Sequence, residues 1–290
     1  MDSDSDFYGD EETITALQKR VTNFNPDSWF SSPNPDQLAL ITPREDPLKT
    51  PTPTTGRFHN RCAGRPGARE LSESVDDFLT RLPPATTNWN FGLDWLWIAN
   101  PYIPDDHNSE DHELFIAGGT SRLQLLSEFI ATANKSGRSP FVVKKEISKA
   151  REAAVQDIRE LAATCNVLSG KWMLFPEAGR VNEVWGTIAH ATARNELGIV
   201  AKVDTRVADG PKKERLICVY TYDFRDKDDV ARVLNRLKQL ELVRAGGRQL
   251  YYKSDAWTEI GIYGGNQWGI PASMYSSNQI FAYLKEKANR

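Results

Sequence analysis

The chain has 290 residues, of which 40% are hydrophobic and 26% charged, with a formal net charge of -3. It is long enough to bury one substantial core. The slightly negative charge excludes a general attraction to polyanions, so any nucleic-acid binding has to come from a local basic patch. The three cysteines, Cys62, Cys165 and Cys218, form no C-x-x-C pair. We therefore expect free thiols in a reducing compartment and no structural zinc.

The N-terminus lacks the features of a secretory signal. Residues 1–12 contain six acidic residues and no basic one, whereas such a signal has a positively charged start and an apolar stretch. No run of about 18 apolar residues, the length needed to span a membrane, occurs in the sequence. We expect a soluble, intracellular chain without a membrane partner, in the cytoplasm or, as an alternative, also in the nucleus.

Proline dominates the first part of the chain. Ten of the sixteen prolines lie between Pro26 and Pro84, where they interrupt regular backbone hydrogen bonding. We predict that residues 1–85 form an acidic and then Pro-rich leader, largely irregular or disordered. A Pro-rich recognition segment is one interpretation of this leader, but a plain linker is favoured.

The folded part is expected to open with a strand over Leu93–Ala99. Alternation places Trp95 and Trp97 on one side of this strand and two aliphatic residues on the other. A second short strand is predicted at Leu114–Ala117, where two glycines then turn the chain. A helix is expected to follow, capped by Thr120 or the next serine.

Further helices and strands follow from the spacing of apolar residues. Asn182 and Asp226 are suitable N-caps for two of the helices. Trp172 and Trp185 fall on the apolar sides of their elements, so we place them in the core, together with the two tryptophans of the first strand. In chain order, the sequence predicts a helix at 144–165, a strand at 171–175, a helix from 182, strands at 199–203 and 216–221, a helix from 226, strands at 249–253 and 259–263, and a short C-terminal helix.

Strands that are separated sometimes by helices and sometimes by short loops indicate the α+β class. We predict a curved, mainly antiparallel sheet with helices packed on one face, in a single domain over residues 86–290. The last part of this domain, from Ile260, is rich in glycine and tyrosine. We interpret it as a C-terminal flap.

Several of these segments, in their order and spacing, resemble a known family. Ser169–Trp172 before a strand, Val184–Trp185 on a helix and Leu250–Lys253 are similar to the second half of the translation initiation factor that binds the mRNA cap. The tail Ile260–Gly269 resembles more specifically the basophilic leukaemia-expressed protein family, which has a fold like that of the cap-binding factor. The likeness covers residues 90–280. It implies a curved antiparallel sheet whose concave face can receive a nucleotide.

In the cap-binding factor, two tryptophans sandwich the methylated base and basic residues on a loop between strands hold the phosphates. The resemblance implies the basic half of such a site here. The candidate phosphate contacts, which include a second basic cluster, are Lys202, Arg206, Lys212, Lys213, Arg215, Arg248 and Lys253. No tryptophan stands where the sandwich would need one, so base stacking of about 1–3 kcal/mol is lost and specific recognition of a methylated cap is not expected. A solvated hairpin loop is the alternative interpretation of the basic residues.

Two aromatic residues of the tail complete the candidate site. Tyr263 and Trp268 lie in polar, glycine-rich sequence. Glycine permits close approach of the backbone, and aromatic rings can stack on a base or contact a partner. The alternative is a flap that closes the edge of the sheet, with Trp268 as its packing anchor.

No catalytic or metal-binding pattern is evident in the sequence. The acidic stretch 105–113 contains His107 and His112, but their spacing of five fits neither one face of a helix nor a zinc pattern, so we interpret it as a surface loop. Neither a P-loop nor a G-x-S-x-G motif occurs. We therefore predict a protein that is not an enzyme and needs no cofactor.

Two functional hypotheses follow. The first is a non-enzymatic module that binds single-stranded RNA or a nucleotide through basic loops on the concave side of the sheet. The second is a protein–protein interaction scaffold that engages partners through the leader and the C-terminal flap, with a vestigial nucleotide face. Resemblance of fold does not decide between them, because one scaffold can serve unrelated functions.

Overall fold

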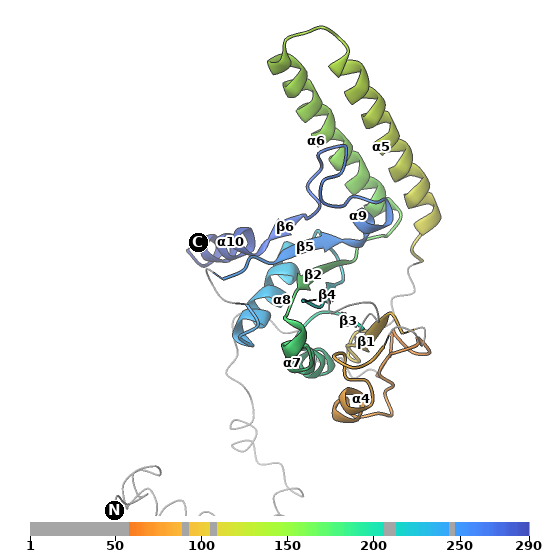
Figure 1. The fold of residues 1–290 in the computed structure, drawn as a ribbon, viewed down its shortest axis with the longest axis vertical. Coiled ribbons are helices and arrows are strands. Elements are labelled where there is room, and N and C mark those ends of the chain that lie inside the picture. Colours follow the sequence, from red (N-terminus) through yellow and green to blue (C-terminus); the bar gives the residue numbers. More distant parts are fainter. Residues whose placement is uncertain (1–57, 89–92, 105–108, 206–212, 244–246, 290) are drawn as a thin grey trace, which may run out of the picture. The chain divides into compact units, whose positions relative to one another are not determined.

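An antiparallel sheet organises the part of the chain that the computed structural model describes, namely residues 58–88, 93–104, 109–205, 213–243 and 247–289 (Figure 1). Its strands lie in the order β1-β3-β4-β2-β5-β6, and every neighbouring pair is antiparallel. The strand bounds are β1 Trp95–Ala99, β2 Gly170–Leu174, β3 Val200–Asp204, β4 Ile217–Thr221, β5 Tyr251–Ser254 and β6 Tyr275–Ser276.

Helices cover one face of this sheet. Helix α7 packs against β1 and β3, helix α8 packs against β4, and α4 and α10 pack against α7 and α8 in turn. Figure 1 shows α7 and α8 lying across the sheet. The helix bounds are α4 Val75–Arg81, α5 His112–Asn134, α6 Pro140–Thr164, α7 Val181–Ala193, α8 Lys227–Gln239, α9 Asp255–Glu259 and α10 Ser277–Ala288. The predicted α+β class, with an antiparallel sheet and helices on one face, is confirmed.

Local sequence explains where several helices begin. The Asp226 side chain accepts hydrogen bonds from the backbone amides of Asp228 and Asp229, as expected of the N-cap of α8. In α10, the Ser276 side chain accepts from the Gln279 amide while the Gln279 side chain accepts from the Ser276 amide. The most regular apolar spacing in the chain belongs to α8, whose inward-facing residues are fully buried. These helices follow closely the periodicity that predicts them.

The main core lies between the helices and the first face of the sheet. Trp172 of β2 and Trp185 of α7 are fully buried there, as predicted. The indole nitrogen of Trp172 donates to the carbonyl of Val230 at 3.0 Å, which satisfies its buried N–H group and ties β2 to α8.

The opposite face of the sheet, called the second face below, has a different composition. Its residues are Trp95, Trp97, Lys171, Met173, Lys202, Cys218, Tyr220, Tyr251 and Lys253. The prediction that Trp95 and Trp97 belong to the main core is wrong, because both are half-buried on this second face. Their neighbours Leu96 and Ile98, fully buried, supply the core side of β1 instead.

The described part of the predicted leader is folded, which corrects the expectation of irregular chain up to residue 85. Helix α4 buries Phe78 completely, and its ring meets the edge of Trp185 at a centroid distance of 6.5 Å. Further upstream, the backbone of Gly67 and Arg69 hydrogen-bonds with Trp97 at 3.0 and 2.9 Å. The folded domain therefore starts well before residue 86; residues 1–57 of the predicted leader lie outside the described residues.

The predicted strand at Leu114–Ala117 is part of a helix. Helix α5 runs without interruption through Gly118 and Gly119 and pairs with α6 in an antiparallel hairpin (Figure 1). A Cβ atom at Gly118 would lie 2.7 Å from the Leu161 side chain, and one at Gly119 would lie 2.9 Å from Ile260. The two glycines thus permit close packing rather than a turn, at an intrinsic cost to helix stability.

A second strand prediction also fails. Residues 259–263 contain the end of α9 and a turn, not a strand. The fully buried Ile262 and the exposed Tyr263 alternate as they would in a strand. This alternation comes from a turn at the edge of the sheet, where Gly261 has a positive φ of 74°.

Two long helices, α5 and α6, raise the question of membrane insertion. None of the helices in the described segments combines the length and the apolar composition that a membrane crossing requires. Several large apolar side chains of the hairpin are nevertheless exposed to solvent; they are Leu114, Ile116, Leu125, Phe129, Phe141 and Val142.

Arg215 is a structural residue rather than a ligand contact. It is 4% exposed, and its Nε atom lies 3.0 Å from Oδ1 of Asp204. Its Nη2 atom donates to the carbonyls of Pro84 and Asp204 at 3.0 and 2.8 Å. The guanidinium therefore joins the β3–β4 hairpin to the segment after α4 and is not available to a ligand.

Replacing Arg215 by Met should lower the free energy of unfolding by about 3 kcal/mol, because a buried carboxylate loses its cation. The matched control is Arg225→Met, which removes an exposed pair with Asp223 and should cost at most about 0.5 kcal/mol. Chemical denaturation of both variants measures the difference. Equal losses of stability in the two variants would contradict the structural role of Arg215.

Candidate functional site

A cleft of about 610 Å³ opens on the second face of the sheet. Strands β1 to β5 supply its floor, and α9 and the tail segment after it supply a wall. The residues that line it are Trp95, Lys171, Met173, Phe175, Lys202, Leu216, Cys218, Tyr251, Lys253, Thr258, Tyr263, Gly264, Ala272 and Ser273. Its volume falls within the usual range of ligand pockets, and most of its wall is apolar.

Three lysines share this cleft because of the register of the strands. Lys171 of β2 pairs directly with Lys253 of β5, and Lys202 of β3 stands opposite Cys218 of β4, which in turn pairs with Met173 of β2. Directly opposed residues in antiparallel strands point to the same face of the sheet. Like charges in such positions destabilise a sheet, so their convergence needs a compensating interaction.

Lys171 has such an interaction. Its ammonium group forms an ion pair with Oδ1 of Asp255, the first residue of α9, and lies 3.3 Å from the hydroxyl of Thr258. The same carboxylate accepts a hydrogen bond from the Ser169 hydroxyl at 2.5 Å. Lys171 is 7% exposed, so this pairing compensates a buried charge.

Lys202 and Lys253 differ from Lys171. Among the residues that the structure describes, no carboxylate forms an ion pair with either of them. They lie on aromatic rings instead: the Lys253 Nζ atom is 3.7 Å from the centroid of Tyr263, and the Lys202 Nζ atom is 4.2 Å from that of Trp95. Cation–π contact offsets only part of the loss of hydration.

The electrostatics of the cleft follow from this burial. Burial, and next the charge of Lys171, lower the pKa of Lys253 to about 8. Burial likewise lowers the pKa of Lys202. Burial raises the pKa of the Cys218 thiol to about 11. Each shift disfavours the charged form of its group, so the cleft is a poorly hydrated place.

A second hollow of about 490 Å³ adjoins the cleft on the same face of the sheet. It brings Arg61 and Arg65 from the N-terminal segment near Trp97, and the Arg65 guanidinium lies 5.0 Å from the Trp97 ring centroid. Acidic residues, including Glu110 and Asp255, line it as well. The charges of this hollow are therefore mixed, whereas those of the cleft are predominantly positive.

The structure brings three of the predicted site residues together: Lys202, Lys253 and Tyr263 all line the cleft. Arg248 lies beside it, with its guanidinium carbon 5.4 Å from the ring centroid of Phe175 and an ion pair to Glu214. These four residues therefore lie in or beside the cleft; their role in binding stays a prediction.

The other predicted residues lie elsewhere. Lys213 is exposed, and its carbonyl accepts from the Ala178 amide at 3.0 Å without the side chain lining the cleft. Trp268 packs against the main core and donates from its indole nitrogen to the Ser127 hydroxyl at 2.8 Å, so it acts as the packing anchor of the flap. Arg206 and Lys212 lie outside the described residues.

Sequence reasoning missed part of the site. The sequence pattern places Lys171 only at the beginning of a strand and Trp95 in the core, whereas both line the cleft. Both could have been found from alternation, because Lys171 precedes the buried Trp172, and Trp95 precedes the buried Leu96. The contributions of Thr258 and Ser273, which line the cleft from α9 and the tail, have no comparable signal in the sequence.

Comparison with known proteins gives two findings. Two crystal structures of Ascaris suum eIF4E-3, in complex with the m2,2,7G cap and with the m7G cap, are similar to this chain at 14% and 15% identity. Each match has a TM-score of 0.28 and covers 38% of this chain and 58% of the other, so the chain matches little more than half the length of these proteins. The family model of basophilic leukemia-expressed protein Bles03 matches residues 17–261. The match covers most of the chain, although it begins within the predicted leader and ends at the start of the tail motif. The chain therefore belongs to the Bles03 family, as the resemblance predicts.

Proposed function

We propose that this chain is a non-enzymatic binding protein whose cleft on the second face of the sheet holds a nucleotide or a segment of single-stranded RNA. The observation that carries the proposal is the pair formed by the half-buried Lys202 and the buried Lys253, for whose ammonium groups the described residues provide no carboxylate partner. Lys171 adds a third cation, paired with Asp255. A phosphate group in the cleft would supply the missing negative charge.

The argument for an anion rests on hydration. A buried ammonium group loses water contacts that an aromatic ring replaces only in part. The lowered pKa of Lys253 shows the same cost, because burial is its largest cause. A phosphate bound between Lys202 and Lys253 would restore charge-assisted hydrogen bonds of the strong class.

The argument for a nucleotide rather than a simple anion rests on the walls. The rings of Trp95, Phe175, Tyr251 and Tyr263 line the cleft. Tyr251 and Tyr263 are 44% and 55% exposed, but the Lys253 ammonium lies over the ring of Tyr263, so the proposal assigns the base to the ring of Tyr251. Stacking of this kind contributes about 1–3 kcal/mol per base and tolerates any sequence.

The cleft does not favour a methylated cap. The base of such a cap carries a positive charge, and the Lys202 ammonium already lies 4.2 and 4.7 Å from the ring centroids of Trp95 and Trp97. The two indoles also stand two residues apart on one strand rather than facing each other across a gap. A cationic base would meet a cation there and find no sandwich, so the proposal is binding without cap specificity.

The chemistry of the cleft supports binding over catalysis. Its thiol, Cys218, has a pKa raised to about 11 by burial, so it is neutral near pH 7 and a poor nucleophile. Within the described segments, no three His, Cys, Asp or Glu side chains are grouped so that they could hold a metal ion. An anion-binding role needs only the lysines and the rings.

Replacing Lys253 by Met should separate binding from folding. The variant should bind uridine 5′-monophosphate or hexauridylate about tenfold more weakly than the parent chain, whose Kd we expect to be of the order of 10 µM at low salt. Its free energy of unfolding should rise by about 1 kcal/mol, a value reduced for solvent screening, because a poorly hydrated charge is removed. Tryptophan fluorescence titration and chemical denaturation measure the two effects.

The control for this experiment is Lys238→Met, which removes an exposed lysine of α8 outside the cleft. This control variant should change neither the nucleotide affinity nor the free energy of unfolding appreciably. If neither nucleotide binds to the parent chain, or if the two variants bind equally well, the proposed site is wrong.

Binding should also depend on pH in a defined direction. Because the pKa of Lys253 in the empty cleft is about 8 and a phosphate favours the protonated lysine, affinity should be nearly full at about pH 7 and below. It should fall by up to about tenfold as the pH rises to about 9. Two adenosines joined only by a phosphodiester are the suitable probe, since neither the phosphodiester nor adenine titrates in this range. Equal affinities at pH 7 and pH 9 would contradict the role of Lys253.

A protein-interaction scaffold is the second candidate function. The observation that favours it is the exposed apolar surface of the α5–α6 hairpin, where Phe141 is 78% exposed and Phe129 41%. Large exposed apolar surfaces often mark contacts with other proteins. Residues 1–57 of the leader, to which this hypothesis assigns partner contacts, lie outside the described residues, and the flap is held in place by Trp268.

The scaffold role can be tested by affinity capture after nuclease treatment. Partners recovered with the full chain should be lost with the double substitution Phe129→Ser and Phe141→Ser, whereas nucleotide binding should persist. Partners lost instead on nuclease treatment would point to RNA as the bridging molecule.

A further inference from the structure

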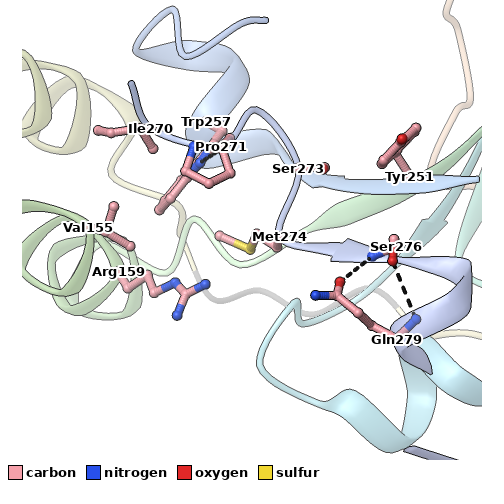
Figure 2. A pocket seen from close by; sticks show the side chains of 10 residues that line it. All are labelled: Val155, Arg159, Tyr251, Trp257, Ile270, Pro271, Ser273, Met274, Ser276 and Gln279. Atoms are coloured by element: carbon pink, nitrogen blue, oxygen red, sulfur yellow. Dashed lines mark hydrogen bonds between the residues drawn. The ribbon is translucent and has the colours of Figure 1, made fainter. Parts of the chain in front are cut away.

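Another cavity, of about 360 Å³ and distinct from the hollow near Trp97, lies beside the cleft, between α6, α9 and the start of α10 (Figure 2). Its lining residues are Val155, Arg159, Tyr251, Trp257, Ile270, Pro271, Ser273, Met274, Ser276 and Gln279. Most of them are apolar or already hydrogen-bonded. Ser276 and Gln279 bond to each other through the N-cap of α10, as the dashed lines of Figure 2 show.

Arg159 is the exception in this cavity. Its Nε atom is buried without a hydrogen-bond acceptor, and no carboxylate among the described residues forms an ion pair with its guanidinium. Figure 2 shows the side chain extending into the cavity from α6. Its guanidinium carbon lies 6.0 Å from the ring centroid of Trp257. A guanidinium placed in this way presents N–H groups to an incoming anion.

The cavity and the cleft share a wall. Tyr251 and Ser273 line both of them. On either side of this boundary, adjacent residues divide between the two: Trp257 lines the cavity and Thr258 the cleft, while Pro271 lines the cavity and Ala272 the cleft. An extended ligand that passes over Tyr251 would therefore reach both sites without leaving the surface.

We propose that the Arg159 cavity is a second phosphate subsite of the cleft, and that the ligand is a single-stranded oligonucleotide of at least two nucleotides. This inference rests on the proposed function. A nucleoside monophosphate has one phosphate, which the lysines of the cleft would hold, and it leaves Arg159 without an anion. A strand that crosses Tyr251 supplies a phosphate to each, with a base against the exposed tyrosine ring between them.

The test compares ligand length with the Arg159→Gln variant of the full chain. Uridine 5′-monophosphate and oligouridylates of two, four and six nucleotides are titrated at several salt concentrations. In the parent chain, affinity should rise about tenfold or more from the monophosphate to the longer strands. The variant should bind the hexamer about tenfold more weakly. The slope of its log affinity against log salt concentration should be less steep by about 0.7. Its affinity for the monophosphate should stay the same.

The matched control is Lys149→Gln, which removes one positive charge from an exposed position of the same helix and should leave every affinity unchanged. Two results overturn the inference while the proposed function stands: a hexamer that binds the parent chain no better than the monophosphate, or a folded Arg159→Gln variant that binds the hexamer normally. The length dependence of the parent chain decides the matter even if the variant does not fold. If no oligonucleotide and no monophosphate binds, the proposed function fails, and this inference fails with it.

Discussion

Side chains of a strand alternate between its two faces, and this constraint decides where the charge of the protein lies. Trp172, Val203 and Tyr252 must face the helices to fill the core, so Lys171, Lys202 and Lys253 have to face the other way. The lysines cannot be moved from the second face without removing core residues from the first. The character of the cleft is therefore coupled to the packing of the core.

The second face is hollow because only part of it is covered. Cys62 and Ala68 of the N-terminal segment pack over β1, β3 and β4 and form a small apolar cluster there. Helix α9 borders the rest of the face, and its first residue, Asp255, forms an ion pair with Lys171. The ion pair between Lys171 and Asp255 lies between the positively charged cleft and the hollow of mixed charge. The N-terminal segment thus covers one part of the second face and leaves the part with the cleft open.

The sequence predicts local features of this fold well and long-range ones less well. Helix α8 and its cap at Asp226 follow from spacing alone, because the information is local. Gly118 and Gly119 predict a turn, because the reason for glycine there, close packing against Leu161 and Ile260, involves residues far along the chain. Alternation grouped Trp95 with Trp97 correctly but did not say which face of the strand meets the helices. For the same reason Lys171 was missed as a site residue.

Both ends of the sheet are protected against pairing with another strand. Beyond β1, the backbone of Gly67 and Arg69 occupies hydrogen-bonding groups of Trp97, and at the other end β6 has only two residues before the chain turns into α10. Long exposed edges are templates for strand addition and for aggregation. Self-assembly by continuing the sheet from one molecule to the next is therefore disfavoured.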